Sequence, residues 1–474
     1  MSAQGADTPD AYSRLKREFE SAEGAGDKER VFRAGQAWVD AFPEHVTPAN
    51  RLAEAHRRHG DLQSALTVIQ RTLAHHPKDA MLLKRASKYC AHMHDLDSAI
   101  EYQLMCAEIP EETRECMLEA ARYRLTLADA RGAREALEAA FAAGEPRDNH
   151  RLSLAHVAYL LRDRAGGLAL LDAELAAQGS SATLDNLRAK LEQLGPERAR
   201  EAPIRLRSPA TAELKAWADQ ANVQTGKPDA SATRLITEAG DILIERVPGS
   251  RAMLIAFGGL STMFGGTAED MGFLVGSGRA NAIFVSDPQR LFMLGGFASI
   301  GEYWTTIGWL KDLKQAWSIE HIYCLGLSGG GYPALRYGLD LGARRILTFA
   351  APTEITPTIT ETDKRATALA HRVLSRRPHM CINLRDEIAK YGAAAPEIIN
   401  YYGSDMPEDS YHGRNIEGLP TVSSRPVAGL DSHGVIAWLK QTGVFRDVLS
   451  EFLRETMPTA PPPEPPPVIK ASWP

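Results

Sequence analysis

The sequence predicts two units of different fold class: an N-terminal α-helical repeat solenoid, then an α/β unit with a doubly wound, mostly parallel sheet. Three observations lead to this prediction. Residues 10–195 are rich in helix-forming residues and repeat a short phrase about every 34 positions. Short apolar, β-branched runs then alternate with helical stretches. The length of 474 residues is enough for both units.

The composition excludes several classes of protein. The chain is 44% hydrophobic and 24% charged, as expected for a soluble globular protein, and its net charge of −6 does not favour nucleic acid as a partner. The five cysteines suit a reducing compartment better than a disulfide framework. The N-terminus lacks the apolar core of a signal peptide, and no run of 18 apolar residues exists. We therefore expect a cytoplasmic protein without a membrane span.

The repeated phrase defines the predicted helical domain, residues 1–195. Gly26-Asp27 recurs as Gly60-Asp61, and DLQSAL recurs as DLDSAI, each after 34 residues. RGAREAL and RAGGLAL follow, the last at a spacing of 31, and prolines recur at 43, 77, 110 and 146. A plain helical bundle has no such period. The pattern resembles the tetratricopeptide repeat, which implies stacked helix pairs with a groove for a protein partner. Packing on the second unit or dimerisation is the alternative use of the array.

The α/β unit is predicted over residues 236–456, after a linker at 196–235 that is rich in Pro, Ser, Thr and charge. Seven runs read as strands: 241–247, 252–257, 281–286, 321–327, 345–351, 397–402 and 422–428. Helical patterns at 303–316, 332–341 and 362–376 separate most of the later ones. Pro248-Gly249-Ser250 predicts a tight hairpin between the first two strands. The proline-rich tail, 457–474, is predicted to be extended and unpacked.

One serine lies in a setting that suits a nucleophile. Gly326-Leu327-Ser328-Gly329-Gly330 fits the pattern G-x-S-x-G, directly after a strand and directly before a helical pattern that starts YPAL. Such a strand–turn–helix junction exposes the hydroxyl near a helix N-terminus, where backbone N–H groups favour negative charge. A phosphate-binding loop is the rival interpretation, but GLSGGG lacks the Lys-Ser/Thr pair that such loops use.

A nucleophilic serine needs an oxyanion hole and a base. Gly259 and Leu260 follow an earlier strand, and their N–H groups, with that of Gly329, are the candidates for the oxyanion hole. An ordinary glycine turn is the alternative there. His433 follows the last strand, and an imidazole can take and return a proton near neutral pH. The alternative for His433 is a surface loop residue.

The acid that orients the histidine should follow the penultimate strand. SDMPEDSYHG offers two candidates there, Asp405 and Asp409. Asp405 is nearer the end of the strand, whereas Asp409 precedes Tyr411-His412 at the predicted start of a helix. We favour Asp409 slightly and keep both, because an aspartate at a helix start is also an ordinary N-cap.

Residues 236–455 resemble an α/β-hydrolase, with the oxyanion turn, the G-x-S-x-G turn and the terminal histidine in that order. More narrowly, VSDPQRLFMLGG, GLSGGGYPALRYG and ILTFAAP resemble hydrolase-like domains of bacterial surface-polysaccharide proteins. The chain departs from them in having no Met or Ala before the second glycine. The resemblance implies a serine esterase that works through an acyl-enzyme on an acyl-ester substrate, without cofactor or metal. The O-acyltransferase with the same triad and the non-catalytic scaffold protein stay open.

Two further groups of residues have bland interpretations. His75-His76 and His92-Met93-His94 lie in the repeats without a ligand set of metal spacing, so we expect solvated helix faces. Four arginines lie in the insertion before the strand at 397–402, which forms the lid of the resembled fold: Arg365, Arg372, Arg376 and Arg377. They either attract an anionic substrate or line a solvated helix, and the solvated helix is favoured.

Overall fold

A computed structural model describes residues 9–144, 150–161, 163–192, 204–206, 233–237, 241–247, 249–259, 280–365 and 367–454. The chain divides into two compact units, Met1–Arg198 and Ala199–Pro474. The predicted tail at 457–474 and most of the predicted linker at 196–235 lie outside the described residues. Within the described ranges, no helix combines the length and the apolar character needed to cross a bilayer.

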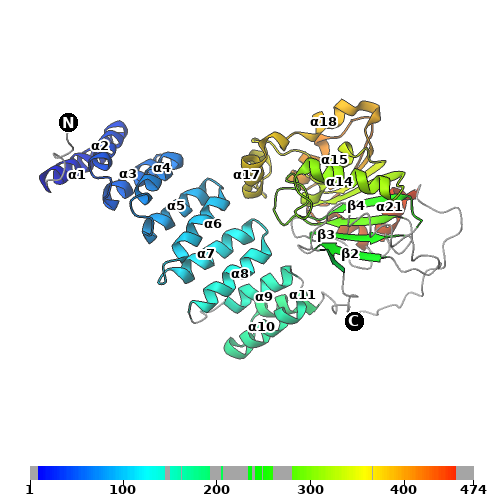
Figure 1. The fold of residues 1–474 in the computed structure, drawn as a ribbon, viewed down its shortest axis with the longest axis horizontal. Helices are drawn as coiled ribbons and strands as arrows, with labels where there is room; N and C mark the ends of the chain where they lie inside the picture. The colour runs from blue at the N-terminus through cyan, green and yellow to red at the C-terminus, as the bar shows by residue number, and fades with distance from the viewer. Residues whose placement is uncertain are drawn as a thin grey trace. The chain divides into compact units, whose positions relative to one another are not determined.

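The first unit is a helical repeat solenoid, as predicted. Its helices follow one another as stacked pairs (Figure 1). Their bounds are α1 Pro9–Gly24, α2 Lys28–Ala41, α3 Val46–Arg58, α4 Leu62–Leu73, α5 Ala80–His92, α6 Leu96–Ala107, α7 Thr113–Thr126, α8 Ala130–Ala142, α9 His150–Leu160, α10 Arg164–Gln178 and α11 Ala182–Glu192. Pro43, Pro77 and Pro110, which recur in the sequence at the repeat period, lie between consecutive helix pairs. Pro146 lies outside the described residues.

An aspartate N-cap sets the period of this unit. The second helix of each pair starts after an aspartate whose side chain accepts a hydrogen bond from the backbone N–H three residues later: Asp27, Asp61, Asp95, Asp129 and Asp163. These positions are spaced by 34 residues throughout. Such a cap stabilises a helix by satisfying one of its free N–H groups. The repeat is therefore regular to the last pair.

The predicted drift to a spacing of 31 residues is wrong. It is counted from Ala136-Leu137, but the residue of the third phrase that is equivalent to Ala99 is Ala133, three positions earlier. Counted from the caps, the small residue four positions on is Ala65, Ala99 and Ala133, each fully buried. The equivalent position in the next pair is Gly167, where a Cβ atom would come within 2.7 Å of the Leu191 side chain. The small side chain lets neighbouring helices approach closely in these four pairs, whereas the first pair has the buried Val31 at the same position.

The second unit is built on one mostly parallel sheet. In the described part of the chain the strand order is β1-β2-β3-β5-β4-β6-β7-β8-β9. The bounds are β1 Ile204–Leu206, β2 Thr233–Thr237, β3 Ile242–Arg246, β4 Ala252–Phe257, β5 Asn281–Val285, β6 His321–Leu327, β7 Arg345–Phe349, β8 Glu397–Gly403 and β9 Val422–Val427. The strands from β5 onward in this order are parallel neighbours, whereas β3 runs antiparallel to β2 and β5.

Two predictions about this sheet need correction. The predicted hairpin between β3 and β4 is wrong, because β5 lies between the two strands. The chain does turn there, with Ser250 N–H donating to Val247 O and Gly249 at a φ of +77°, but the strands on either side pair elsewhere. The sheet also begins earlier than predicted, since β1 and the start of β2 belong to the segment that was expected to be a linker.

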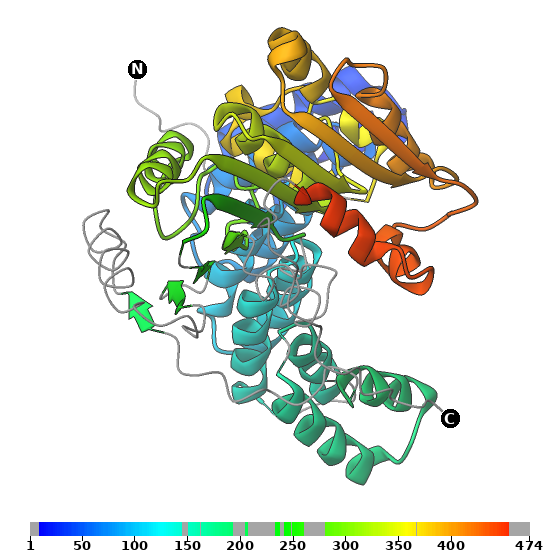
Figure 2. The same ribbon diagram turned by 90° about the vertical axis from the view of Figure 1, so that its right-hand side faces the viewer.

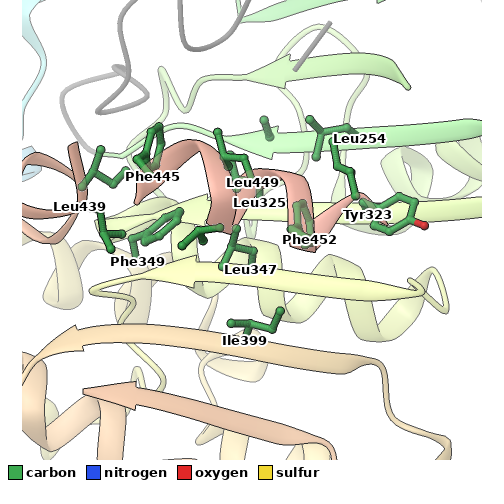
Figure 3. Close-up of a cluster of buried hydrophobic side chains, with 14 of the residues drawn as sticks. Leu254, Tyr323, Leu325, Leu347, Phe349, Ile399, Leu439, Phe445, Leu449 and Phe452 are labelled. Carbon is green, nitrogen blue, oxygen red and sulfur yellow. The ribbon is translucent and has the colours of Figure 1, made fainter. Parts of the chain in front are cut away.

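Helices cover both faces of the sheet. On one face α20 (Val435–Gln441) and α21 (Phe445–Phe452) pack on the strands: Figure 2 shows α21 in red beside the sheet, and Figure 3 shows it lying over the strands. Figure 3 shows the apolar layer that these elements bury together, which includes Leu254, Leu325, Leu347 and Leu449. Because this layer anchors α20, it also fixes one end of the loop that joins β9 to α20.

The opposite face is covered by α14 (Tyr303–Ala316) and α15 (Gly331–Asp340). The ring of Tyr337 lies 5.3 Å from that of Phe257 on β4 and 5.4 Å from that of Phe297. The other α-helices in the described part of this unit are α16 Ile359–Thr362, α17 Thr367–Arg376, α18 Leu384–Tyr391 and α19 Pro407–Asn415. The carboxyl ends of β4, β6, β7, β8 and β9 meet at one edge, where parallel α/β sheets bind their ligands.

Candidate active site

Ser328 lies in a strained turn between β6 and α15. It follows the last residue of β6 directly, in a short 3-10 turn, and has a φ of +51°. A non-glycine residue keeps this left-handed backbone conformation only where the surrounding structure enforces it. A Cβ atom at Gly326 would lie 2.5 Å from the carbonyl oxygen of Gly330, and one at Gly330 would lie 2.5 Å from that of Gly258. Both glycines of the pattern are therefore required by close backbone approach.

Three side chains that the sequence singled out form one hydrogen-bonded chain. The Ser328 Oγ atom lies 2.7 Å from His433 Nε2, and His433 Nδ1 lies 2.9 Å from each carboxylate oxygen of Asp409. Since the carboxylate accepts, Nδ1 carries the proton and Nε2 accepts from the serine hydroxyl. The Asp409 side chain is 1% exposed, whereas that of His433 is 39% exposed. The imidazole thus reaches solvent, and the acid is buried behind it.

The chain topology explains how these residues meet. Ser328 follows β6, Asp409 lies in the first turn of α19 after β8, and His433 lies in the loop between β9 and α20. Because these strands are parallel, their following loops all start at the same edge of the sheet. Asp409 is buried against this edge in a helix whose first position is Pro407, a residue that suits a helix start.

The other candidate acid, Asp405, points elsewhere. Its carboxylate accepts a hydrogen bond from Ser404 Oγ at 2.5 Å, and its residue is exposed. Its backbone N–H donates to Leu430 O, which ties the loop after β8 to the loop after β9. Among the described residues His433 receives its carboxylate contact from Asp409, not from Asp405.

The oxyanion candidates are described in part. Gly259 is buried and follows β4, and Gly329 is buried in the turn that starts α15. The two segments are adjacent, because the space beside Gly330 is closed by the carbonyl groups of Phe257 and Gly258. Gly258 N–H donates to Val285 O at 2.9 Å, which fixes this turn to β5. Leu260 lies outside the described residues.

Arg365 is a member of the site that the sequence did not identify as such. Its Nη1 atom lies 2.7 Å from Asp409 Oδ1 and 3.2 Å from His433 Nδ1, and its Nη2 atom lies 2.7 Å from Asp363 Oδ2. The sequence assigned it to a solvated helix of the lid, but the structure puts it between α16 and α17, against the acid. No local pattern identifies it, because the contact joins residues 44 positions apart.

The ion pairs perturb both partners in this segment. Burial alone would raise the pKa of Asp363, but hydrogen bonds from His412 and Arg365, together with the guanidinium charge, hold it well below its usual range. Burial would lower the pKa of the Arg365 guanidinium, and its bonds to Asp363 and Asp409 instead raise it. Both groups therefore stay charged at neutral pH.

The described residues offer no site for a metal ion: no group of three or more His, Cys, Asp or Glu side chains gathers in these ranges. The cysteines of the chain, Cys90, Cys106, Cys116, Cys324 and Cys381, are free thiols. Burial raises the pKa of the Cys381 thiol to about 11, so this half-buried thiol is not a thiolate nucleophile at neutral pH.

Comparisons with known proteins give a limited result. No family model matches the chain, and no curated protein matches it. Part of the chain is similar to a solved tetratricopeptide repeat protein from Parabacteroides merdae, with 15% identity, 46% of this chain and 80% of that chain covered, and a TM-score of 0.31. It is also similar to pilF of Pseudomonas aeruginosa, with 15% identity, coverage of 40% and 86%, and a TM-score of 0.28. A third similar structure is MamA of Desulfovibrio magneticus, with 14% identity, 36% of this chain and 97% of that chain covered, and a TM-score of 0.28.

Proposed function

We propose that the second unit is a serine hydrolase of the α/β-hydrolase type that acts on an acyl ester through an acyl-enzyme. The observation that carries the proposal is the continuous hydrogen-bonded chain Ser328–His433–Asp409 on a strained strand–helix turn. Ser, acid and His follow in the chain order that α/β-hydrolases use. The fold alone does not establish an activity, and so the argument depends on this geometry.

In the proposed reaction, Ser328 Oγ attacks the ester carbonyl carbon while its proton passes to His433 Nε2. The carbonyl oxygen becomes an oxyanion, which the N–H groups of Gly259 and Gly329 are proposed to receive, with Leu260 as the third candidate. The imidazolium then protonates the departing alcohol, which leaves an acyl-Ser328 ester. Water attacks this ester and gives a proton to His433, and the imidazolium returns that proton to the departing Ser328 Oγ, which releases the carboxylic acid and restores the serine hydroxyl.

The acyl acceptor decides the biological reaction. A sugar hydroxyl in place of water makes the same machinery an O-acyltransferase, which fits the resemblance to polysaccharide-linked hydrolase domains. Small or medium esters are favoured over peptides, because the insertion between β7 and β8 is short, at about 45 residues.

A fluorophosphonate probe tests the proposed nucleophile. We expect the full-length wild-type protein to be labelled and to hydrolyse a p-nitrophenyl acyl ester, because the activated Oγ attacks phosphorus as it attacks a carbonyl. Ser328→Ala removes the attacking atom and should abolish labelling and reduce ester turnover by at least about 10³-fold. Ser404→Ala, at a serine that contacts Asp405 instead, is the matched control and should change neither. Equal labelling of wild type and Ser328→Ala would refute the proposal.

Binding of a protein partner by the helical unit is the second candidate function. It is favoured by the stacked helix pairs, because arrays of this kind form an extended binding surface. In this case the α/β unit is a scaffold. Absence of ester turnover in a folded full-length protein, together with probe labelling that does not depend on Ser328, would favour this function over the first.

A further inference from the structure

Behind the acid, the hydrogen-bonded chain Ser328–His433–Asp409 continues into an array of charged and polar side chains: Arg365, Asp363 and His412. Arg365 links the carboxylates of Asp409 and Asp363. Asp363 is in turn 3.5 Å from Nε2 of His412, a residue on the same face of α19 as Asp409. The array thus joins the loop between α16 and α17 to the helix that carries the acid.

The tautomer of His412 follows from its other contact. The backbone N–H of Thr353 donates to His412 Nδ1 at 3.2 Å, so Nδ1 accepts and Nε2 carries the proton toward Asp363. The Thr353 hydroxyl also donates to the His412 carbonyl at 2.8 Å. His412 is 2% exposed and Asp363 has a side chain that is 10% exposed, so the array is fixed by buried partners.

The charges of the array show what Arg365 supplies. Asp409 is 1% exposed, and a buried carboxylate without a counter-ion is strongly destabilised. While His433 is neutral, Arg365 is the cation that contacts this carboxylate. With Asp363 and Asp409 negative and Arg365 positive, the array has a net charge of −1 in the resting state and becomes neutral when the imidazolium forms. The Asp409 carboxylate is the group that stabilises the imidazolium, since Arg365 Nη1 lies 3.2 Å from His433 Nδ1 and carries the same charge as the imidazolium.

We propose that Arg365 is a positioning residue of this site: anchored by Asp363 and His412, it holds the Asp409 carboxylate in the orientation that keeps the proton on Nδ1 of His433. The inference rests on the proposed hydrolase function for its kinetic consequence, but its structural part does not. Arg365 is itself an exposed residue, and its claim to this role rests on its contact with the Asp409 carboxylate, whereas Asp405 contacts Ser404.

Kinetics of the full-length protein test the proposal. Arg365→Gln should lower kcat for a p-nitrophenyl ester by about 10- to 100-fold with little change in KM, because the acid is misplaced rather than the substrate. Arg365→Lys keeps the positive charge but has no forked guanidinium that can contact both carboxylates, and its kcat should lie between those of Arg365→Gln and wild type. Free guanidinium at millimolar concentration should partly rescue Arg365→Gly. Lys364→Gln removes the neighbouring cation and is the matched control, with kcat unchanged.

A spectroscopic measurement separates this inference from the proposed function. In ¹⁵N-histidine-labelled wild type, the His433 side chain, assigned by its loss in His433→Asn, should show the tautomer protonated on Nδ1. Arg365→Gln should show a mixture of tautomers. Asp363→Asn should show a smaller change in the same direction, and it replaces Arg365→Gln as the test if that variant fails to fold. Unchanged tautomer and kcat would overturn the role of Arg365. If the tautomer responds in this way but the protein has no ester turnover, the positioning role of Arg365 stands and the hydrolase proposal fails.

Discussion

At the scale of single residues, the two aspartates after β8 have separate surroundings although only four positions separate them. Asp409 is buried and contacts His433 and Arg365, whereas Asp405 is exposed and contacts Ser404. The difference arises because Asp409 lies inside the first turn of α19, which turns its side chain toward the loop after β9. Position in the sequence alone does not distinguish the two.

This difference gives a prediction for catalysis. Asp409→Asn should lower kcat by about 10⁴-fold, because an amide in place of the carboxylate favours the wrong imidazole tautomer while the shape is kept. Asp405→Asn should stay within about threefold of wild type, since this exposed carboxylate does not contact the imidazole. The measurement is ester turnover by both variants at equal protein concentration. A larger loss in Asp405→Asn than in Asp409→Asn would assign the acid role to Asp405.

At the scale of elements, the junctions inside the helix pairs use one backbone geometry with different residues. The residue before each of the first four capping aspartates has a positive φ: Gly26 and Gly60 at +67° and +78°, but also His94 and Ala128 at +62° and +55°. The dipeptide Gly-Asp therefore marks only the first two of these junctions in the sequence. The aspartate, not the glycine, is what recurs in every pair.

A pair of substitutions tests this geometry. His94→Gly should raise the free energy of unfolding by about 0.5–1 kcal/mol, because a non-glycine residue has a steric cost in the left-handed region that exceeds the added chain entropy of glycine. Gly60→Ala should lower it by about 1 kcal/mol, although a Cβ atom there meets nothing within 4 Å. Urea unfolding followed by circular dichroism measures both. Changes of the opposite sign would show that contacts of the side chains outweigh the backbone term.

Elements with a local signal were predicted from the sequence, and those set by distant pairing were not. The seven predicted strands are present as β3 to β9. Most of them are apolar or aromatic runs with clear boundaries, whereas β9, VSSRPV, is largely polar. The strands β1 and β2 were missed, since IRL and TRLIT are short and adjoin polar sequence. The order β3-β5-β4 was also missed, because it depends on which strands pair and not on the turn at Gly249.

The same distinction applies to the site. Ser328, Asp409 and His433 each follow a strand with a recognisable local pattern, and the structure brings the three side chains together. Asp363 and Arg365 have no such pattern. Arg365 reaches the acid, and Asp363 reaches His412, because the segment between β7 and β8 folds back onto α19. Their part in the site is visible only in three dimensions.

At the scale of the whole molecule, each of the two units has its own hydrophobic core. The helical unit has separate clusters along the array, such as those around Trp38, Leu137 and Leu187, as expected for repeats that contact their neighbours. The α/β unit has a large cluster in which α20 and α21 pack on the strands (Figure 3). Separate cores permit separate unfolding, since the stability of each unit then depends on its own residues.

We therefore expect calorimetry of the full-length protein to show two unfolding transitions, each moved by substitutions in one unit alone. His94→Gly should raise the midpoint of one transition by about 2–4 °C and leave the other in place. Gly308→Ala, on an exposed position of α14 where a Cβ atom meets nothing within 4 Å, should raise the other by a similar amount, because alanine favours the helix. A single transition that both substitutions move together would mean that the two cores unfold as one cooperative unit.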